Sequence, residues 1–287
     1  MNKYEKLGKT IIDELRLCFT AESEFLETIS CLDFGERIDF ERISIRRIVG
    51  QHFEYYYTVL DHNNNITAYM YHGRYGDDSN FIWLKVENKV LYNSPQLHNL
   101  INDVQISLPI VFNNITKLDL AKDFIKNTVY TIKKLMKNKD IKTIINGKVV
   151  KDRSKIIQEM IMVYQTSLDR IKNPSLKICQ AEAVKNKSKG ITIQAYNKNS
   201  ELDSSDKKYI SEFYGNPKHL HRLEVRLNSG EIKDYYKRCE KEETINDIFN
   251  EELLTDMYSY HLGSVLRFTK GRKQILWNDI LCIDNTR

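Results

Sequence analysis

Three short stretches of this sequence alternate apolar residues with carboxylates, basic groups or a tyrosine. The stretches are LDLAKDF (118–124), GITIQAYNK (190–198) and HRLEVRL (221–227). In a β-strand, successive side chains point to opposite faces, so each stretch would place an apolar row on one face and a polar row on the other. The polar rows would hold Asp119, Asp123, Gln194, Tyr196, Lys198, Arg222, Glu224 and Arg226.

Carboxylates, a tyrosine and basic groups on one sheet face suit a metal-assisted reaction at a phosphodiester. Carboxylate oxygens bind Mg²⁺ or Mn²⁺, the metal polarises the scissile phosphate, and the basic groups hold the nucleic-acid backbone. A tyrosine on that face can act as the nucleophile and stay joined to the cleaved strand. A half-buried antiparallel sheet has a polar face in any case, so an ordinary solvated face is the competing interpretation.

Two histidines ahead of the third polar row are a second candidate for metal binding. His219 and His221 are separated by one leucine, a spacing found in enzymes that nick single-stranded DNA. Both share their parity with Leu223, Val225 and Leu227, the row that should be buried. We therefore expect the histidines to face the core or to lie in the approach to the strand, and Glu224 to be the better ligand.

The first part of the chain predicts a helical segment followed by hairpins. Residues 1–30 have apolar residues at helix-like spacing, and we place an N-terminal helical segment at 1–35. From 40 to 93 the period changes to two, in HFEYYYTVLD and ITAYMYHG around HNNN, which predicts antiparallel hairpins. The run Tyr55-Tyr56-Tyr57 indicates either a sheet core or a surface on which bases stack.

Amphipathic helices are expected at 95–105, 124–139 and 154–172. The polar face of the second holds Lys126, Lys133, Lys134 and Lys137, which would either contact phosphates or lie in ordinary solvent. Asn146-Gly147 suits a type I′ hairpin turn. The predicted fold is α+β, a central antiparallel sheet with helices covering one face, comprising a nicking and DNA-binding core at 36–235 and a helical C-terminal region at 236–287.

Composition narrows the class of protein. The 287 residues include 44 Lys and Arg against 39 Asp and Glu, and this net charge of +5 permits a polyanionic partner without requiring one. The five cysteines are scattered and form no CxxC pair, which argues against a zinc site or a disulfide framework. No run approaches the roughly 18 apolar residues of a membrane span. A cytoplasmic protein without membrane partners is expected.

The order of these elements resembles the rolling-circle replication initiators of the filamentous-phage gene II type and the related plasmid replication-initiation factors. Those proteins have an (I/L)-x-x-(R/L)-(I/L)-D strand, a Y-x-K-x-x-E-L element and an R-(F/V/L)-E strand. Here the matching stretches are ITKLDLAKDF, AYNKNSEL and HRLEVRL, the last followed by SGEIKDYY. With the hairpins, the resemblance covers about residues 40–265.

The resemblance implies an initiator that nicks one strand at a double-strand origin and stays joined to the 5′ phosphate through tyrosine. The 3′ hydroxyl would prime a host polymerase, and a host helicase would be a further partner. Single-stranded DNA would be a second nucleic-acid partner, and the protein would be able to form a homodimer. Asp119 and Glu224 would bind Mg²⁺ or Mn²⁺. Asp123 would be a third metal ligand, less suited because four strand residues span about 13 Å, and capping of the basic helix is the alternative role for its carboxylate.

The nucleophile departs from the family pattern. In the plasmid branch it lies in a Y-x-G-S-x-x-S strand, where this chain has CQAEAVKNKSKG and no tyrosine. Tyr196 is the best substitute by parity, followed by Tyr235 and Tyr236, and then by Tyr258 and Tyr260. The residues expected to hold DNA are Lys185, Lys187, Lys189, Lys198, Arg222 and Arg226. A non-catalytic DNA-binding control protein and a metal nuclease with a water nucleophile remain alternatives.

Overall fold

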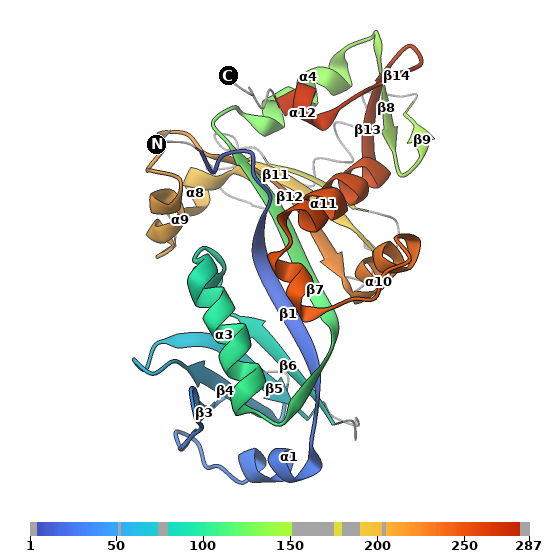
Figure 1. Cartoon of the computed structure of the whole chain (residues 1–287). Coiled ribbons are helices and arrows are strands. Elements are labelled where there is room, and N and C mark those ends of the chain that lie inside the picture. Colours follow the sequence, from blue (N-terminus) through green and yellow to red (C-terminus); the bar gives the residue numbers. More distant parts are fainter. Residues whose placement is uncertain are drawn as a thin grey trace. The chain divides into compact units, whose positions relative to one another are not determined.

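The computed structural model describes residues 5–50, 53–73, 80–150, 175–179, 190–202 and 205–281. The chain has an α+β fold and divides into two compact units (Figure 1). Unit A comprises residues 12–118 and 236–246, and unit B comprises 1–11, 119–235 and 247–287. The units are therefore built from interleaved stretches of chain. No helix in the described ranges is long and apolar enough to cross a membrane.

Unit A contains an antiparallel sheet and helices. Its strand order is β7-β1-β6-β5-β4-β3-β2. The strands are β1 (Ile11–Ala21), β2 (Arg37–Asp39), β3 (Ser44–Ile48), β4 (Tyr55–Leu60), β5 (Ile66–His72), β6 (Phe81–Val86) and β7 (Ile110–Phe124). The helices are α1 (Ser23–Ser30), α2 (Asn88–Leu91) and α3 (Ser94–Ser107). The hairpins expected between 40 and 93 are confirmed as β4, β5 and β6.

The start of the chain differs from the sequence-based expectation. A helix is expected over the first thirty residues, but within the described residues 5–30 a strand spans 11–21 and the helix is confined to 23–30. Leu15, Leu17 and Phe19 are fully buried, and Leu17 and Phe19 are the Cα partners of Leu84 and Ile82 on β6. Their period of two was hidden by additional apolar residues at helical spacing. Residues 11–21 form a strand because they pair with β6, and such tertiary pairing overrides a weak local preference for helix.

Unit B contains the three predicted polar strands in one antiparallel sheet of order β10-β11-β12-β7. The new strands are β10 (Leu176–Cys179), β11 (Thr192–Asn197) and β12 (His221–Asn228). The helical elements that follow β11 and β12 are α8 (Lys198–Leu202), α9 (Lys208–Phe213), α10 (Ser229–Arg238), a 3-10 turn (Ile245–Phe249) and α11 (Glu251–Val265). Leu223, Val225 and Leu227 are fully buried, which confirms the predicted apolar row.

A second, four-stranded sheet lies in unit B, with strand order β14-β13-β8-β9. It consists of β8 (Ile141–Ile145), β9 (Lys148–Val149), β13 (Leu266–Lys270) and β14 (Lys273–Ile275), with α4 (Thr128–Lys137) and α12 (Trp277–Leu281). Asn146 and Gly147 have φ of 48° and 76°, as the predicted type I′ turn requires. The C-terminal region, expected to be helical, thus also contains a hairpin. The helix expected at 154–172 lies outside the described residues.

Candidate functional site

Strand register in unit B brings the predicted polar groups together. On β11 and β12, Gln194 is the Cα partner of Glu224, and Tyr196 is the partner of Arg222. Since paired residues point to the same face, Tyr196 is a diagonal neighbour of Glu224. Strand β7, which carries Asp119, is the next neighbour of β12 in the sheet.

Tyr196 is the centre of a short hydrogen-bonded chain. Its phenol donates to Oε2 of Glu224 at 3.0 Å. Nζ of Lys198 donates to the phenol oxygen at 3.4 Å and to Oε2 of Glu201 at 2.7 Å. A carboxylate that accepts a hydrogen bond from the phenol is placed to take its proton as a general base, and an ammonium group beside the same oxygen can stabilise negative charge that develops on it. A nucleophilic tyrosine needs a base within hydrogen-bonding reach, and this arrangement is compatible with that requirement.

Asp119 and Glu224 converge on a single cation, the guanidinium of Arg226. Nε of Arg226 lies 2.5 Å from Oε1 of Glu224 and 3.5 Å from Oδ2 of Asp119. Burial alone would lower the pKa of Arg226, but the charges of Glu224 and Asp119 outweigh it and raise that pKa. The side chain of Arg226 is 41% exposed, whereas those of Glu224 and Asp119 are 0% and 4% exposed. The carboxylates are therefore fixed, and the cation between them has access to solvent.

Asp123 belongs to a separate, fully buried ion pair with Arg222. Nε and Nη2 of Arg222 donate to Oδ1 and Oδ2 of Asp123 at 2.8 and 2.6 Å. Both side chains are 0% exposed. Helix α4 is instead capped by Asn127, whose side chain accepts from the backbone N of Tyr130. Asp123 is thus neither placed beside Asp119 and Glu224 nor used as the helix cap.

The polar rows are not the open face that the alternation of residues predicted. Asp119, Asp123, Arg222 and Glu224 are all buried, while Tyr196 is half-buried. Ionised side chains are rarely buried, because removal from water is costly unless partners compensate. An ordinary solvated sheet face has no reason to bury four charged groups. Burial therefore favours the interpretation as a functional site over the solvated-face alternative.

Two of the cations expected to contact DNA are also buried. Lys198 and Arg222 are 0% exposed and are bound to Glu201 and Asp123. In this structure the two cations neutralise these carboxylates and do not reach solvent. Of the predicted DNA-binding set, Arg226 reaches solvent, and Lys185, Lys187 and Lys189 lie outside the described residues.

The carboxylate pair is compatible with a small divalent ion. Mg²⁺ is commonly held by one or two carboxylates, with water and substrate phosphate oxygens completing its shell. Asp119 and Glu224 supply two carboxylates, and the place where an ion would contact both is the one that the guanidinium of Arg226 occupies. Within the described ranges, no three His, Cys, Asp or Glu residues are grouped as ligands for a metal ion. A metal would thus depend on water or phosphate and would displace the guanidinium.

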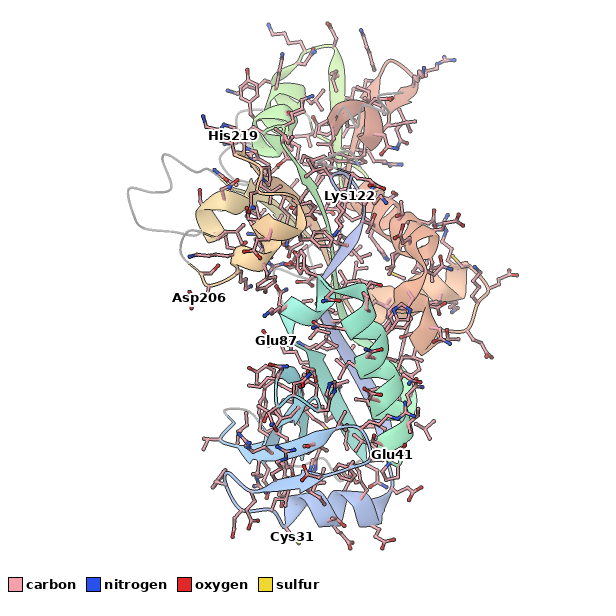
Figure 2. All side chains as sticks on the ribbon, turned by 60° about the vertical axis from the view of Figure 1, so that its left-hand side comes forward. Cys31, Glu41, Glu87, Lys122, Asp206 and His219 are labelled. Atoms are coloured by element: carbon pink, nitrogen blue, oxygen red, sulfur yellow. The ribbon has the colours of Figure 1, made fainter. Side chains whose placement is uncertain are left out.

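The histidines take the positions that strand parity indicated. His219 is exposed in the approach to β12, where its side chain is visible in Figure 2. His221 is the first residue of β12 and is 8% exposed. Burial, and then the charge of His219, lower the pKa of His221. Its parity differs from that of Glu224, so the carboxylates and the histidines belong to different faces.

The remaining candidate tyrosines are less suited to attack a DNA phosphate. Tyr235 is 1% exposed and donates to Oδ2 of Asp256 at 2.5 Å, and Tyr236 is 4% exposed. Tyr258 is 2% exposed and donates to a backbone carbonyl, and burial together with the charges of Asp123 and Glu224 raises its pKa. Tyr260 is 37% exposed, and its ring lies beside Tyr235. Of these candidates, Tyr196 alone both reaches solvent and contacts a carboxylate of the site.

Glu201 contacts the candidate site, and the sequence analysis did not assign it a role. It is the glutamate of the AYNKNSEL element, in which Tyr196, Lys198 and Glu201 follow at fixed spacing. Lys198 is fully buried and bridges the other two side chains. The spacing Y-x-K-x-x-E therefore allows the lysine to contact both the tyrosine and the glutamate. This spacing is the sequence feature from which the position of Glu201 could have been predicted.

A second feature of unit B is a concentration of positive charge. We define the basic lobe as residues 126–150 and 266–281, which contain eleven Lys and Arg against two Asp. Because the whole chain has a net charge of only +5, the rest of it is net acidic. The exposed cations of the lobe include Lys126, Lys134, Lys137, Lys142, Lys148, Lys270, Arg272 and Lys273. Such a concentration attracts a polyanion.

The hairpin of β13 and β14 presents part of this charge at its tip. Lys270 and Lys273 are Cα partners, separated by the two-residue turn Gly271-Arg272. Gly271 has a φ of 60°, which a two-residue turn favours at this position. A projecting basic ribbon has the dimensions to follow a groove or a phosphate backbone. The sequence analysis identified the lysines of α4 but missed this hairpin.

Comparison with known proteins gives a likeness in structure but not in sequence. No protein-family model matches the chain, and no curated protein sequence matches it. Among solved structures, the chain is similar to a rolling circle replication initiator protein from Geobacillus stearothermophilus, at 13% identity and a TM-score of 0.45. The alignment covers 96% of this chain and 94% of that chain. The functional proposal rests on the residues of this chain.

Proposed function

We propose that this chain nicks and rejoins one strand of DNA through a covalent bond to Tyr196, as an initiator of rolling-circle replication. The observation that carries the proposal is the contact of the Tyr196 phenol with Glu224 on one side and Lys198 on the other. The order of the three motif stretches supports the same class of reaction. The basic lobe supports duplex origin DNA as the partner.

In the proposed reaction, Glu224 accepts the phenolic proton as the oxygen of Tyr196 attacks phosphorus. The P–O3′ bond breaks, the 3′ oxygen leaves and takes up a proton, and the 5′ phosphate remains on tyrosine. The ammonium group of Lys198 stabilises the phenolate before attack and again when it is released. Attack by a 3′ hydroxyl on the phosphotyrosine reverses these steps and rejoins the strand.

The two oxygens of Glu224 have separate tasks in this scheme. Oε2 contacts Tyr196, whereas Oε1 is on the side of Arg226 and Asp119. Asp119 and Glu224 would hold Mg²⁺ or Mn²⁺, which supplies Lewis-acid polarisation of the phosphate. Arg226, when displaced from the carboxylates, remains close enough to neutralise a phosphate oxygen.

One observation favours a second candidate, a DNA-binding control protein without nicking activity. Arg226 already neutralises both carboxylates in the position where a divalent ion would bind. A chain that had lost its metal would keep this ion pair for stability and would still bind DNA through the basic lobe. This candidate predicts origin binding without any covalent adduct.

The test is adduct formation on labelled single-stranded origin DNA with Mn²⁺, followed by denaturing electrophoresis. We expect a protein–DNA band in the native chain and its loss in Tyr196→Phe. Tyr260→Phe, at an exposed tyrosine of the same unit, is the matched control and should keep the band. Cleavage without an adduct would point to a water nucleophile. Tight binding without cleavage would support the second candidate.

A further inference from the structure

The two faces of the unit A sheet differ in burial. Tyr57, Met70 and Leu84, which are Cα partners across β4, β5 and β6, are at most 1% exposed and belong to the core. The opposite face carries the next row of partners, Tyr56, Tyr71 and Trp83. Of these three, Tyr56 and Trp83 are only half-buried. Large aromatic side chains are therefore placed on the face that is less buried.

The rings of this row are aligned with one another. The centroids of Tyr56 and Tyr71 are 5.3 Å apart at 6°, and those of Tyr71 and Trp83 are 6.2 Å apart at 12°. Tyr69, half-buried, extends the group, with its centroid 6.1 Å from that of Tyr56. Phe53, which precedes β4, lies 4.2 Å from Tyr71 and 5.6 Å from Trp83. A planar ring from outside the strands thus already rests against this row.

Basic side chains flank the rings on the same face. Arg46, Thr58, Tyr69, Lys85 and Arg16 form the adjacent row of Cα partners, from β3 to β1. Arg46 is exposed, and Lys85 and Arg16 are half-buried. Burial raises the pKa of Tyr71 while the charge of Arg16 opposes this rise, which places the guanidinium close to that ring.

One acid, Glu14, is shared between two cations. Glu14 accepts from Nε of Arg16 at 2.8 Å and from Nζ of Lys117 at 2.6 Å, so one carboxylate faces two cations. Burial and neighbouring groups raise the pKa of Tyr56 and of Tyr71, so both rings are neutral near pH 7. Burial, and then the charge of Glu87, raise the pKa of Tyr69, so Glu87 is a second acid near the rings. The face therefore combines aromatic rings with cations, of which Arg16 is paired with Glu14.

We propose that this aromatic face, defined by Tyr56, Tyr69, Tyr71 and Trp83 with Arg16, Arg46 and Lys85, binds single-stranded nucleic acid by stacking of its bases. Aromatic rings beside cations are the means by which proteins hold single strands without regard to sequence. Cross-strand aromatic pairs explain why the rings are aligned. They do not explain why the rings lie on the less buried face beside three cations.

This site is separate from the nicking chemistry and does not rest on it. All of its residues belong to unit A, whereas Tyr196 and Glu224 belong to unit B. A chain that forms no adduct can still bind single-stranded DNA through the aromatic face. A chain that forms an adduct does not have to bind DNA through that face. The two proposals therefore fail independently when binding and adduct formation are measured on the same protein.

Intrinsic fluorescence gives a direct test, because the chain has two tryptophans, Trp83 and Trp277. In Trp277→Phe protein, emission reports Trp83 alone. Titration with oligo(dT) should quench this emission saturably, and duplex DNA of equal length should not. The same titration on protein that also carries Tyr196→Phe should give the same quenching, whatever the outcome of the adduct assay.

Substitution of one ring should weaken binding by a measurable factor. Tyr56→Ala should lower the affinity for oligo(dT) roughly 5- to 100-fold, the range for loss of one base–aromatic stack. Phe34→Ala is the matched control, since Phe34 is 68% exposed in unit A and outside the row. An unchanged affinity in Tyr56→Ala, or equal quenching by duplex, would overturn the proposal.

Cross-linking covers the case in which Tyr56→Ala does not fold. Oligonucleotides that carry 5-iododeoxyuridine are irradiated with the native chain, and the attached peptides are identified by mass spectrometry. Attachment at Tyr56, Tyr69 or Trp83 supports the proposal. Attachment confined to other peptides overturns it.

Discussion

The phenol of Tyr196 and the carboxylate of Glu224 are joined by a 3.0 Å hydrogen bond between adjacent strands of unit B. The bond exists because Gln194 pairs with Glu224, which leaves Tyr196 one diagonal step away on the same face. The other oxygen of Glu224 is held by Arg226 at 2.5 Å. One carboxylate thus connects a possible nucleophile to a site for a cation.

Replacement of Glu224 by Gln should slow adduct formation by roughly 10²- to 10⁴-fold, the usual contribution of a general base. The amide keeps the shape of the side chain but cannot accept the phenolic proton as a carboxylate does. Adduct yield against time on denaturing gels measures the effect. Glu212→Gln, at an exposed glutamate of α9, should leave the rate unchanged. An equal rate in Glu224→Gln would remove this residue from the mechanism.

Removal of the guanidinium should improve metal binding. In Arg226→Gln, Asp119 and Glu224 lose their shared cation and repel each other, so Mn²⁺ should bind more tightly than to the native chain. Isothermal titration calorimetry without DNA measures the affinity. Adding Asp119→Asn to Arg226→Gln should abolish the gain. If Arg226→Gln takes up no more Mn²⁺ than the native chain, the carboxylate pair is not a metal site.

The Asp123–Arg222 pair should matter for stability more than for chemistry. Asp123→Asn leaves a buried guanidinium without its counter-charge and should lower the free energy of unfolding by about 3–5 kcal/mol. Asp123→Leu combined with Arg222→Met should recover most of the loss. Urea denaturation measures both changes. Asp39→Asn, at an exposed ion pair with Arg37, should change the unfolding little, and a similarly small effect in Asp123→Asn would contradict the assignment.

Unit A should lose stability in acid through His72. This histidine is 5% exposed, and burial, followed by the charge of Arg47, lowers its pKa from 6.5 to about 4. Because the folded pKa is lower than the unfolded one, the stabilisation is complete above about pH 6.5 and falls as the pH decreases toward about 4.

The expected loss is about 2 kcal/mol of unfolding free energy between about pH 7.5 and about pH 5. Urea denaturation at the two pH values measures it. His72→Gln should reduce this dependence, whereas His62→Gln, at an exposed histidine of the same unit, should leave it in place. An unchanged dependence in His72→Gln would assign the effect to other groups.

The basic lobe should control duplex binding through phosphates. Each phosphate contact contributes roughly 0.9 to the slope of log affinity against log salt concentration. The triple substitution of Lys270, Arg272 and Lys273 by Ala should therefore lower the slope by up to about 3. Fluorescence anisotropy with duplex DNA over a range of salt measures it. Lys89→Ala, at an exposed lysine of unit A, is the control, and an unchanged slope in the triple variant would exclude the hairpin.

The sequence by itself determined which residues share a face in each polar strand. Alternation of apolar and polar residues placed Glu224 opposite Leu223 and Val225, and it excluded His221 from the carboxylate row before any contact was known. The type I′ turn at Asn146-Gly147 was likewise predictable from the sequence, since both residues tolerate positive φ. These features depend on near neighbours in the chain, and the structure agrees with them.

Tertiary structure alone decided which polar groups pair and which are buried. The sequence did not indicate that Asp123 is taken by Arg222, that Arg226 bridges Asp119 and Glu224, or that Lys198 is fully buried beside Glu201. Register between strands sets these contacts, and register depends on residues up to about a hundred positions apart. The strand over 11–21 was decided in the same way, because pairing with β6 outweighs helix-like spacing along the chain.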